Sequence, residues 1–352
     1  MRWRSREKKR AGPGCAVWEI TLTCNLNCIH CGSAAGKKRS DELSTEEAFD
    51  LCDALKDIDC KGVALMGGEP LLRPDWADIS ERVHDLGMEL SIITNGWLGQ
   101  DDRVVQQIVD LSPECITVSL DGGEASVHDM IRGVKGSFER ATRALERYAS
   151  LGLPTTAITA VHKLNLNQLV KIRDYLRGIG VAWQIQMATP FGRLERHQVL
   201  SPEEYYSVAM FIASTKKLYS NEVLVAGAHD MGYFSNVLPE LQVKDWQGCQ
   251  AGISTLGIQS NGNILGCLAL GDDFVEGNVR SHPLQEIWYD ESSFAFARHY
   301  KKEDMKAHCG KCAFKERCGG GCSAVSYSLV GGLHQDPYCT RHIEESMKSE
   351  LP

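Results

Sequence analysis

Three cysteines near the start of the chain have the spacing of a metal-binding loop. Cys24, Cys28 and Cys31 are spaced C-x3-C-x2-C and follow a strand-like run over residues 17–22. Three thiolates on one short loop can hold three corners of a four-iron cluster. The fourth iron would then lack a protein ligand from this loop and could chelate a small molecule. A zinc site is the alternative, because His30 could supply a fourth ligand.

A second motif, Gly67-Gly68-Glu69-Pro70, follows the next strand-like run. Glycines let a backbone approach a ligand closely, and proline stiffens a turn. Together with the cysteine loop, this motif resembles the radical S-adenosylmethionine (SAM) superfamily, whose cluster reductively cleaves SAM to methionine and a 5'-deoxyadenosyl radical. The resemblance implies that the three cysteines bind a [4Fe–4S] cluster. It also implies that the glycine motif binds the methionine end of SAM, with Glu69 placing negative charge near its ammonium group.

The same resemblance implies further contacts with SAM. Ser119 and Asp121 are expected near the ribose, and Arg132 near the carboxylate. His30 takes the place of an aromatic ring that packs near SAM in the superfamily. Two more candidates are Asn95 and Gln186. Several of these polar residues could instead only stabilise a loop.

Seven more cysteines lie in the C-terminal part of the chain. They are Cys249, Cys267, Cys309, Cys312, Cys318, Cys322 and Cys339. Their spacing, with Gly262 between the first two and C-x2-C-x5-C-x3-C over the next four, resembles the SPASM domain. This domain extends many radical SAM enzymes and holds auxiliary iron–sulfur clusters. A pair of zinc ribbons is the alternative for this region.

The SPASM resemblance implies two auxiliary [4Fe–4S] clusters. One would be ligated fully by Cys309, Cys312, Cys318 and Cys339. The other would be ligated by Cys249, Cys267 and Cys322. Because seven thiolates cannot fill eight corners, one iron needs water, a carboxylate or a substrate atom. The remaining cysteines are expected to be small buried hydrophobic residues: Cys15, Cys52, Cys60 and Cys115.

The elements that must position these motifs alternate between strand and helix patterns. Strands are expected over residues 15–23, 63–66, 90–94, 116–120, 155–161 and 183–187. Helices are expected from the capping box Ser44-x-x-Glu47, after Asp75, over 103–111, 137–150 and 166–176, and from Ser201 to about Leu218. This alternation predicts an α/β fold, a partial (β/α)6 TIM-like barrel. The motifs then meet at the carboxyl ends of the strands, where such barrels carry their chemistry.

Three regions are expected along the chain. Residues 1–14 would form a flexible basic tail, since the charges from Arg2 to Arg10 lie at a chain end. The partial barrel would cover residues 15–235, and the Cys-rich SPASM domain residues 245–345. The boundary is placed between about 235 and 248, beyond which glycine and cysteine become dense and long helical periods are absent.

Composition limits the kinds of partner. The chain has 352 residues, 43% of them hydrophobic, which suits one large domain and a smaller one. A net charge of -8 gives no basic surplus, so nucleic acid is not expected as a partner. No secretory signal and no apolar stretch of about 18 residues is found, so a membrane is not expected either. With its many cysteines assigned to metal, the protein is expected in the cytoplasm.

The resemblance implies an oxidoreductase that removes a hydrogen atom from an unactivated carbon. SPASM relatives mostly modify peptides, so maturation of a ribosomally made precursor by cross-linking, oxidation or excision is the leading prediction. Cys24 leaves no room before it for a peptide-recognition domain, so a separate recognition protein is expected, with flavodoxin or ferredoxin as the electron donor. The alternatives are an enzyme acting on a tetrapyrrole or sugar derivative and a non-catalytic electron carrier.

Overall fold

The computed structural model describes residues 10–228, 231, 234–241 and 246–349. Within these residues, ten strands form one sheet of order β10-β9-β8-β1-β2-β3-β4-β5-β6-β7. The strands are β1 (Cys15–Thr21), β2 (Gly62–Gly67), β3 (Glu89–Thr94), β4 (Cys115–Ser119), β5 (Thr155–Val161), β6 (Ala182–Met187), β7 (Val225–Gly227), β8 (Thr255–Ile258), β9 (Asn263–Leu265) and β10 (Val275–Asn278). Neighbours from β8 to β7 pair in parallel, and β8, β9 and β10 pair antiparallel.

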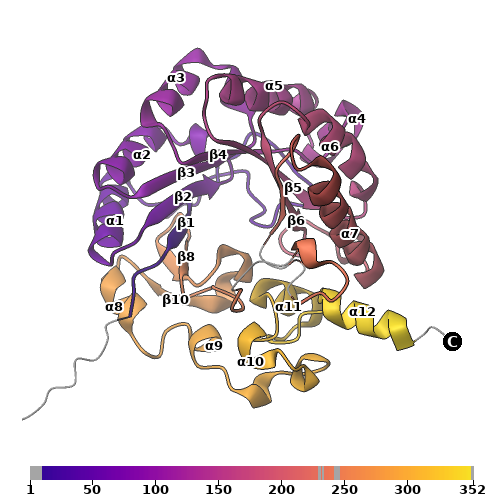
Figure 1. Cartoon of the computed structure of the whole chain (residues 1–352). Helices are drawn as coiled ribbons and strands as arrows, with labels where there is room; N and C mark the ends of the chain where they lie inside the picture. The colour runs from indigo at the N-terminus through magenta and orange to yellow at the C-terminus, as the bar shows by residue number, and fades with distance from the viewer. Residues whose placement is uncertain (1–9, 229–230, 232–233, 242–245, 350–352) are drawn as a thin grey trace, which may run out of the picture.

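Helices cover the outside of this curved sheet (Figure 1). They are α1 (Thr45–Asp57), α2 (Trp76–Asp85), α3 (Asp102–Leu111), α4 (Ala125–Arg132), α5 (Ser137–Ser150), α6 (Leu169–Leu176) and α7 (Pro202–Tyr219). The C-terminal part, orange to yellow in Figure 1, closes the arc of strands from below. Its helices are α8 (Leu284–Tyr289), α9 (Ala295–Arg298), α10 (Lys315–Cys318), α11 (Ser323–Val330) and α12 (Thr340–Ser349). The predicted α/β fold with a parallel sheet is confirmed.

Alternating burial along the strands shows which side faces the helices. In β6, Trp183 and Ile185 are buried, and the Trp183 ring meets the Phe211 ring of α7 at 5.8 Å. Gln184 and Gln186 are only half-buried. Because successive side chains in a strand point to opposite faces, the two glutamines lie on the concave face of the sheet.

The sheet is larger than the six strands expected. β7 adds a seventh parallel strand beside β6, and it is only three residues long, too short to give a periodic signal. β8 pairs in parallel with β1, with Cys15 opposite Thr255 and Trp18 opposite Ile258. The C-terminal part therefore continues the sheet of the barrel, a pairing between segments too far apart in sequence for local pattern to reveal.

Several local expectations were wrong. β1 ends at Thr21 rather than Thr23. Asp75 holds the N-cap position of α2 but makes no capping bond, because its carboxylate accepts hydrogen bonds from Arg73 Nε (2.7 Å) and Thr45 Oγ1 (2.6 Å). The helix α4 and the helices α8 to α12 were not expected. The capping boxes that begin at Ser44, as expected, and at Ser201 are both present.

Other expectations fall partly outside the described residues. The basic charges before Arg10 do so, as do residues 242–245 within the proposed domain boundary. Cys52 and Cys60 are buried in the core as expected, whereas Cys15 and Cys115 are half-buried.

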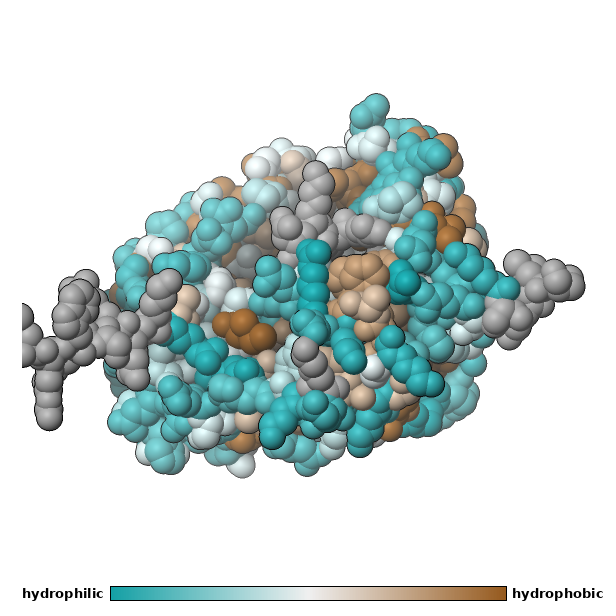
Figure 2. Space-filling model, turned by 60° about the horizontal axis from the view of Figure 1, so that its bottom comes forward, coloured by the Kyte–Doolittle hydropathy of each residue, from teal (hydrophilic) through white to brown (hydrophobic). Residues whose placement is uncertain are grey.

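No helix within the described ranges is long and apolar enough to cross a lipid bilayer. Figure 2 shows that the face carrying the C-terminal part is covered mainly by hydrophilic side chains.

Candidate functional site

The first three cysteines lie on the loop after β1, at the carboxyl edge of the sheet. The N–H groups of Leu26 and Ala35 donate to the sulfur atoms of Cys24 and Cys31, each at 3.4 Å. Burial raises the pKa of Cys24 to about 11. A bound cation would therefore be needed to keep this buried sulfur as a thiolate at neutral pH. Amide donors aimed at sulfur suit the thiolate ligands of an iron–sulfur cluster.

The glycines of the second motif let the loop after β2 close onto the cysteine loop. A Cβ atom on Gly67, whose φ is +145°, would lie 2.1 Å from the Thr21 carbonyl oxygen. A Cβ on Gly68 would lie 2.3 Å from the Thr23 carbonyl oxygen. The N–H groups of Gly68 and Glu69 donate to these same two oxygens at 2.8 Å. Both N–H groups are thus used inside the protein, and the predicted contact of this motif with SAM stays a prediction.

Glu69 joins the loop after β2 to the loop after β3. Its carboxylate is fully buried and accepts hydrogen bonds from Thr94 Oγ1 (2.7 Å), Asn95 N (2.7 Å) and Leu71 N (3.3 Å). Burial raises the pKa of Glu69 to about 7, although the hydrogen bonds from these donors act to lower it. Pro70, also buried, begins the short 3-10 turn that follows. Glu69 thus ties the two loops together, and its predicted charge toward the SAM ammonium stays a prediction.

Asn95 fits the loop-stabilising alternative. Its Nδ2 donates to Asn25 Oδ1 in the cysteine loop at 2.8 Å, and its Oδ1 accepts from Trp97 N at 2.8 Å. Ser119 ends β4 and, like Gln186 on β6, lies at a half-buried position of its strand. The structure thus brings Asn95 into contact with the cysteine loop. Ser119 and Gln186 lie near the carboxyl ends of β4 and β6, at the same edge of the sheet.

A buried network of charges lies beside Cys28. Asp121, fully buried, contacts Arg132 Nη2 at 2.5 Å and His30 Nε2 at 3.2 Å. Burial alone would raise the pKa of Asp121, but the charge of Arg132 and the contact with His30 bring it well below its usual range. Arg132 Nη1 lies 3.7 Å from the Cys28 sulfur. Burial lowers the pKa of His128, whose Nδ1 accepts from the Asp121 N–H, to about 4.

Three nitrogen atoms in this network are buried without a hydrogen-bond partner in the described part of the chain. They are Arg132 Nε, His30 Nδ1 and His162 Nε2. The rings of His30 and His162 lie 5.3 Å apart, and burial lowers the pKa of His162 to about 4. Unpaired buried polar atoms are costly, and several together indicate a missing polar ligand. The residues present therefore fit a ligand such as SAM, with its carboxylate and hydroxyl groups.

His162 was missed by the sequence analysis. It follows β5 directly, at the strand end where the other motifs stand. A polar residue immediately after a predicted barrel strand was the available signal.

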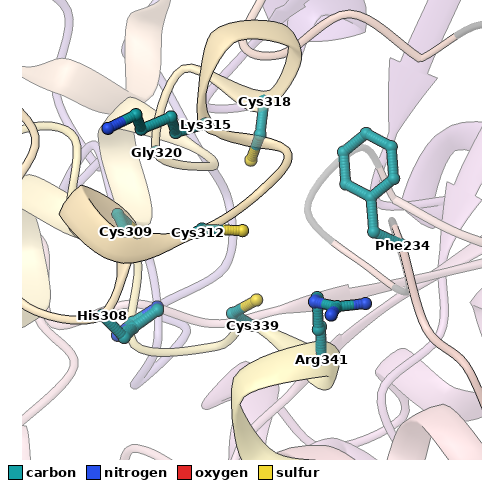
Figure 3. A pocket seen from close by; sticks show the side chains of 9 residues that line it. All are labelled: Phe234, His308, Cys309, Cys312, Lys315, Cys318, Gly320, Cys339 and Arg341. Atoms are coloured by element: carbon teal, nitrogen blue, oxygen red, sulfur yellow. The ribbon is translucent and has the colours of Figure 1, made fainter. Parts of the chain in front are cut away.

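Four of the later cysteines line one pocket. Cys309, Cys312, Cys318 and Cys339 surround it together with other side chains, among them Phe234, His308, Lys315 and Arg341. Figure 3 shows the sulfur atoms of Cys312, Cys318 and Cys339 turned toward the same space. Burial raises the pKa of the Cys309, Cys318 and Cys339 thiols to about 12. This grouping agrees with the four-cysteine ligand set expected from the sequence.

The other three cysteines are not among the residues that line this pocket. Cys249 and Cys267 are close enough to interact electrostatically, and burial raises the pKa of Cys267 to about 11. Cys322 holds the N-cap position of α11, and its N–H donates to Asp336 Oδ2 at 3.0 Å. Among the described residues, no three His, Cys, Asp or Glu side chains converge on a point suited to a single metal ion. The assignment of each cysteine to a cluster stays a prediction.

Comparison with known proteins defines the class. The profile of the radical SAM superfamily matches residues 18–176, and that of the SPASM iron–sulfur cluster-binding domain matches residues 249–313. The AdoMet-dependent heme synthase of Methanosarcina barkeri is 30% identical, with 93% of this chain and 96% of that protein covered. The mycofactocin maturase MftC of Mycobacterium tuberculosis is 31% identical, with 98% of this chain and 87% of that protein covered.

Solved structures share the fold. Streptococcus suis SuiB bound to its precursor peptide SuiA has a TM-score of 0.73 at 18% identity, over 95% of this chain and 76% of SuiB. The enzyme anSMEcpe with bound AdoMet has a TM-score of 0.71 at 17% identity, over 96% of this chain and 99% of that one.

The chain belongs to the radical SAM superfamily and carries a C-terminal SPASM domain. It is therefore a radical SAM enzyme, and its cofactors are SAM and [4Fe–4S] clusters.

Proposed function

We propose that this enzyme matures a ribosomally made peptide. The observation that carries the proposal is the similarity to mycofactocin maturase, which extends over 98% of the chain at 31% identity. The shared fold supports it further, because in SuiB this fold binds a precursor peptide. Cross-linking, side-chain oxidation and excision are the outcomes that the proposal includes.

The proposed roles of the chain's own residues follow from their positions. Cys24, Cys28 and Cys31 hold the SAM-binding cluster, and the later cysteines hold two auxiliary clusters in the sets given above. When bound, the first cluster and SAM supply the 5'-deoxyadenosyl radical that removes a hydrogen atom from the substrate. Asp121 orients Arg132, whose free Nε is the donor available to the SAM carboxylate.

The histidines beside this network have a complementary arrangement. His30 Nε2 faces the Asp121 carboxylate, so that nitrogen carries a proton, and in the neutral ring Nδ1 is an acceptor. His162 Nδ1 accepts from the Leu164 N–H at 3.3 Å, so Nε2 of the neutral ring is a donor. The two free nitrogen atoms can therefore accept from and donate to a bound hydroxyl group.

Mass spectrometry of the substrate tests the proposal. Reconstituted enzyme, SAM and dithionite are incubated anaerobically with peptides encoded in neighbouring reading frames. We expect a mass change on one such peptide, in step with the release of 5'-deoxyadenosine. Nucleoside release without a change in any of these peptides would contradict a peptide substrate while leaving the radical SAM chemistry intact.

A tetrapyrrole substrate is the second candidate. The heme synthase of Methanosarcina barkeri is 30% identical, and its Fe-coproporphyrin III synthase is 28% identical over 97% of this chain. Iron coproporphyrin III added to the same assay distinguishes the candidates. A shift of its absorbance on binding, with no mass change in any of the peptides, would favour the tetrapyrrole over the peptide.

Delivery and electron supply are further parts of the proposal. A separate recognition protein would bring the precursor, and flavodoxin or ferredoxin would supply the electron. Equal rates with and without the recognition protein would contradict the first of these. A cytoplasmic location stays a prediction from the use of cysteine.

A further inference from the structure

The loop between β6 and α7 is fastened to the cysteine loop by one arginine. Arg193 donates three hydrogen bonds to backbone carbonyls of that loop. Its N–H reaches Cys31 O at 3.0 Å, its Nε reaches Cys28 O at 2.8 Å, and its Nη1 reaches Ala35 O at 2.8 Å. A single residue thus spans the cysteine loop from its second cysteine to the residues beyond its third.

The residue before this arginine allows the close approach. Gly192 has a φ of +61°, and a Cβ there would lie 2.2 Å from Cys31 O and 2.4 Å from Gly32 O. Two backbones in contact, with a fork-shaped guanidinium across them, form a stiffer support than a flexible lysine could give.

The charge of Arg193 also lies at the cysteine loop. A guanidinium stays charged at any pH that the protein tolerates. Arg132, the other cation beside Cys28, contacts Asp121 at 2.5 Å, so a carboxylate balances its charge. No ion pair to Arg193 is seen among the residues that the structure describes. Among the described residues, then, no carboxylate lies within ion-pair distance of Arg193 to balance its positive charge.

We propose that Arg193 is a positioning residue for the SAM-binding cluster, which holds the cysteine loop and favours the reduced cluster. The inference rests on the proposed assignment of Cys24, Cys28 and Cys31 as ligands. Reduction adds negative charge to a cluster that three thiolates already make anionic, and local charge and hydrogen bonds set cluster potentials. A positive charge against the Cys28 carbonyl therefore raises the potential, which eases electron uptake.

The loop between β6 and α7 also offers a matched control residue. Arg196 donates to Leu329 O at 2.8 Å and to Ser328 O at 3.0 Å, near the C-terminal end of α11. Arg196 thus fastens the loop to the C-terminal part, as Arg193 fastens it to the cysteine loop. Substituting it removes an arginine and two carbonyl bonds from the same loop without touching the cysteines.

The experiment compares Arg193→Met, Arg193→Lys and Arg196→Met with the wild-type holoenzyme. The potential of the SAM-binding cluster is read by electron paramagnetic resonance, from the signal that changes on adding SAM. The rate at which a chelator removes iron is measured on the same samples. For Arg193→Met we expect a more negative potential and about tenfold faster loss of the iron that this signal reports, since two charge-assisted hydrogen bonds are lost.

The other variants separate geometry from charge. Arg193→Lys should keep a potential near that of the wild type and still lose this iron faster, because an ammonium cannot reach both carbonyls. Arg196→Met should match the wild type in both readouts. An unchanged potential in Arg193→Met would overturn the proposal, and if that variant does not fold, so would wild-type iron loss in Arg193→Lys. Absence of a SAM-responsive signal in the wild type would instead overturn the ligand assignment itself.

Discussion

The two cysteine-bearing regions of this chain are supported in different ways. The loop after β1 is hydrogen-bonded by segments that follow four other elements of the barrel. Gly68 and Glu69 bond it after β2, and Asn95 bonds it after β3. The carbonyls of Ile131 and Arg132, at the end of α4, accept from its backbone at 2.9 and 3.1 Å. The fourth segment is the loop after β6, which bonds the cysteine loop through Arg193.

Within the described residues, the four cysteines of the later pocket lie on or beside short turns and helices rather than at the ends of strands. Cys309 begins a 3-10 turn of three residues, and Cys318 ends a helix of four residues. Three consecutive glycines follow, Gly319 to Gly321, with φ values of +65°, +83° and +86°. The four thiols of this segment line one pocket.

The difference concerns what holds each ligand set in place. Hydrogen bonds from neighbouring loops hold the first site, so we expect its geometry to depend little on metal. In the second, short turns surround a pocket that a cluster would fill, and metal binding then contributes directly to folding. We therefore expect metal loss to affect function at the first site and structure at the second.

The largest expected effect is on SAM cleavage. Replacing Cys24, Cys28 and Cys31 together by alanine should abolish release of 5'-deoxyadenosine, because no thiolate is left for the SAM-binding cluster. Iron content should fall from roughly twelve to roughly eight atoms per chain, since each cubane holds four. Chromatography of the nucleoside and iron analysis measure both. A melting transition that collapses in this variant would contradict a preformed first site.

Removal of all iron should unfold the second region before the first. After anaerobic chelation, we expect limited proteolysis to cut between about Cys309 and Cys339 while the strands of the barrel stay protected. Mass spectrometry of the fragments locates the cuts. Cys318→Ser serves as the comparison, since it should produce the same cuts without chelation. First cleavage within residues 24–36 would reverse the comparison.

Glycine substitutions test the tight contact at the first site. Gly68→Ala would place a Cβ 2.3 Å from the Thr23 carbonyl oxygen, whereas a Cβ on Gly32 would have no atom within 4 Å. We expect Gly68→Ala to destabilise the protein by about 1–3 kcal/mol, as overpacking does. Gly32→Ala should change stability by less than about 0.5 kcal/mol. Denaturant unfolding measures both, and equal effects would show that the contact relaxes freely.

Local sequence patterns predicted the parts of this molecule that depend on local spacing. Strand and helix periods located the barrel, and the capping box at Ser44 is present as expected. The resemblance to the SPASM domain implied a set of four cysteines, and those four line one pocket in the structure.

What was missed depends on contacts between distant segments. Arg193 and Cys28 are 165 residues apart in sequence. β8, in the C-terminal part, pairs with β1, near the start of the chain. No local period encodes such pairs. The motif Gly67-Gly68-Glu69-Pro70 was expected to bind SAM, and that stays a prediction. Its hydrogen bonds to the cysteine loop depend on the pairing of β2 with β1, which the motif itself does not encode.

The smallest expected effect concerns the contact between the two regions at the surface. Glu47 in α1 forms a two-bond pair with Arg280, which follows β10, at 2.6 and 2.7 Å. The hydrogen bond from Arg280, with one from the Ser44 N–H, lowers the pKa of Glu47 from 4.5 to about 2. A carboxyl whose pKa is lower in the folded state stabilises the protein above its unfolded pKa. This contribution is therefore complete above pH 4.5 and is lost as the pH falls toward 2.

Glu47→Gln should consequently lower the free energy of unfolding at pH 7 by less than about 1 kcal/mol, because exposed pairs are screened by solvent. The deficit relative to the wild type should shrink at pH 3. Glu46→Gln, an exposed neighbour in the same helical turn, is the control and should show no such pH dependence. We expect the variant and the wild type to lose acid-labile clusters equally. The difference between their unfolding curves then isolates the ion pair between Glu47 and Arg280. A deficit that is constant from pH 7 to pH 3 would mean that the ion pair between Glu47 and Arg280 makes no measurable contribution to stability.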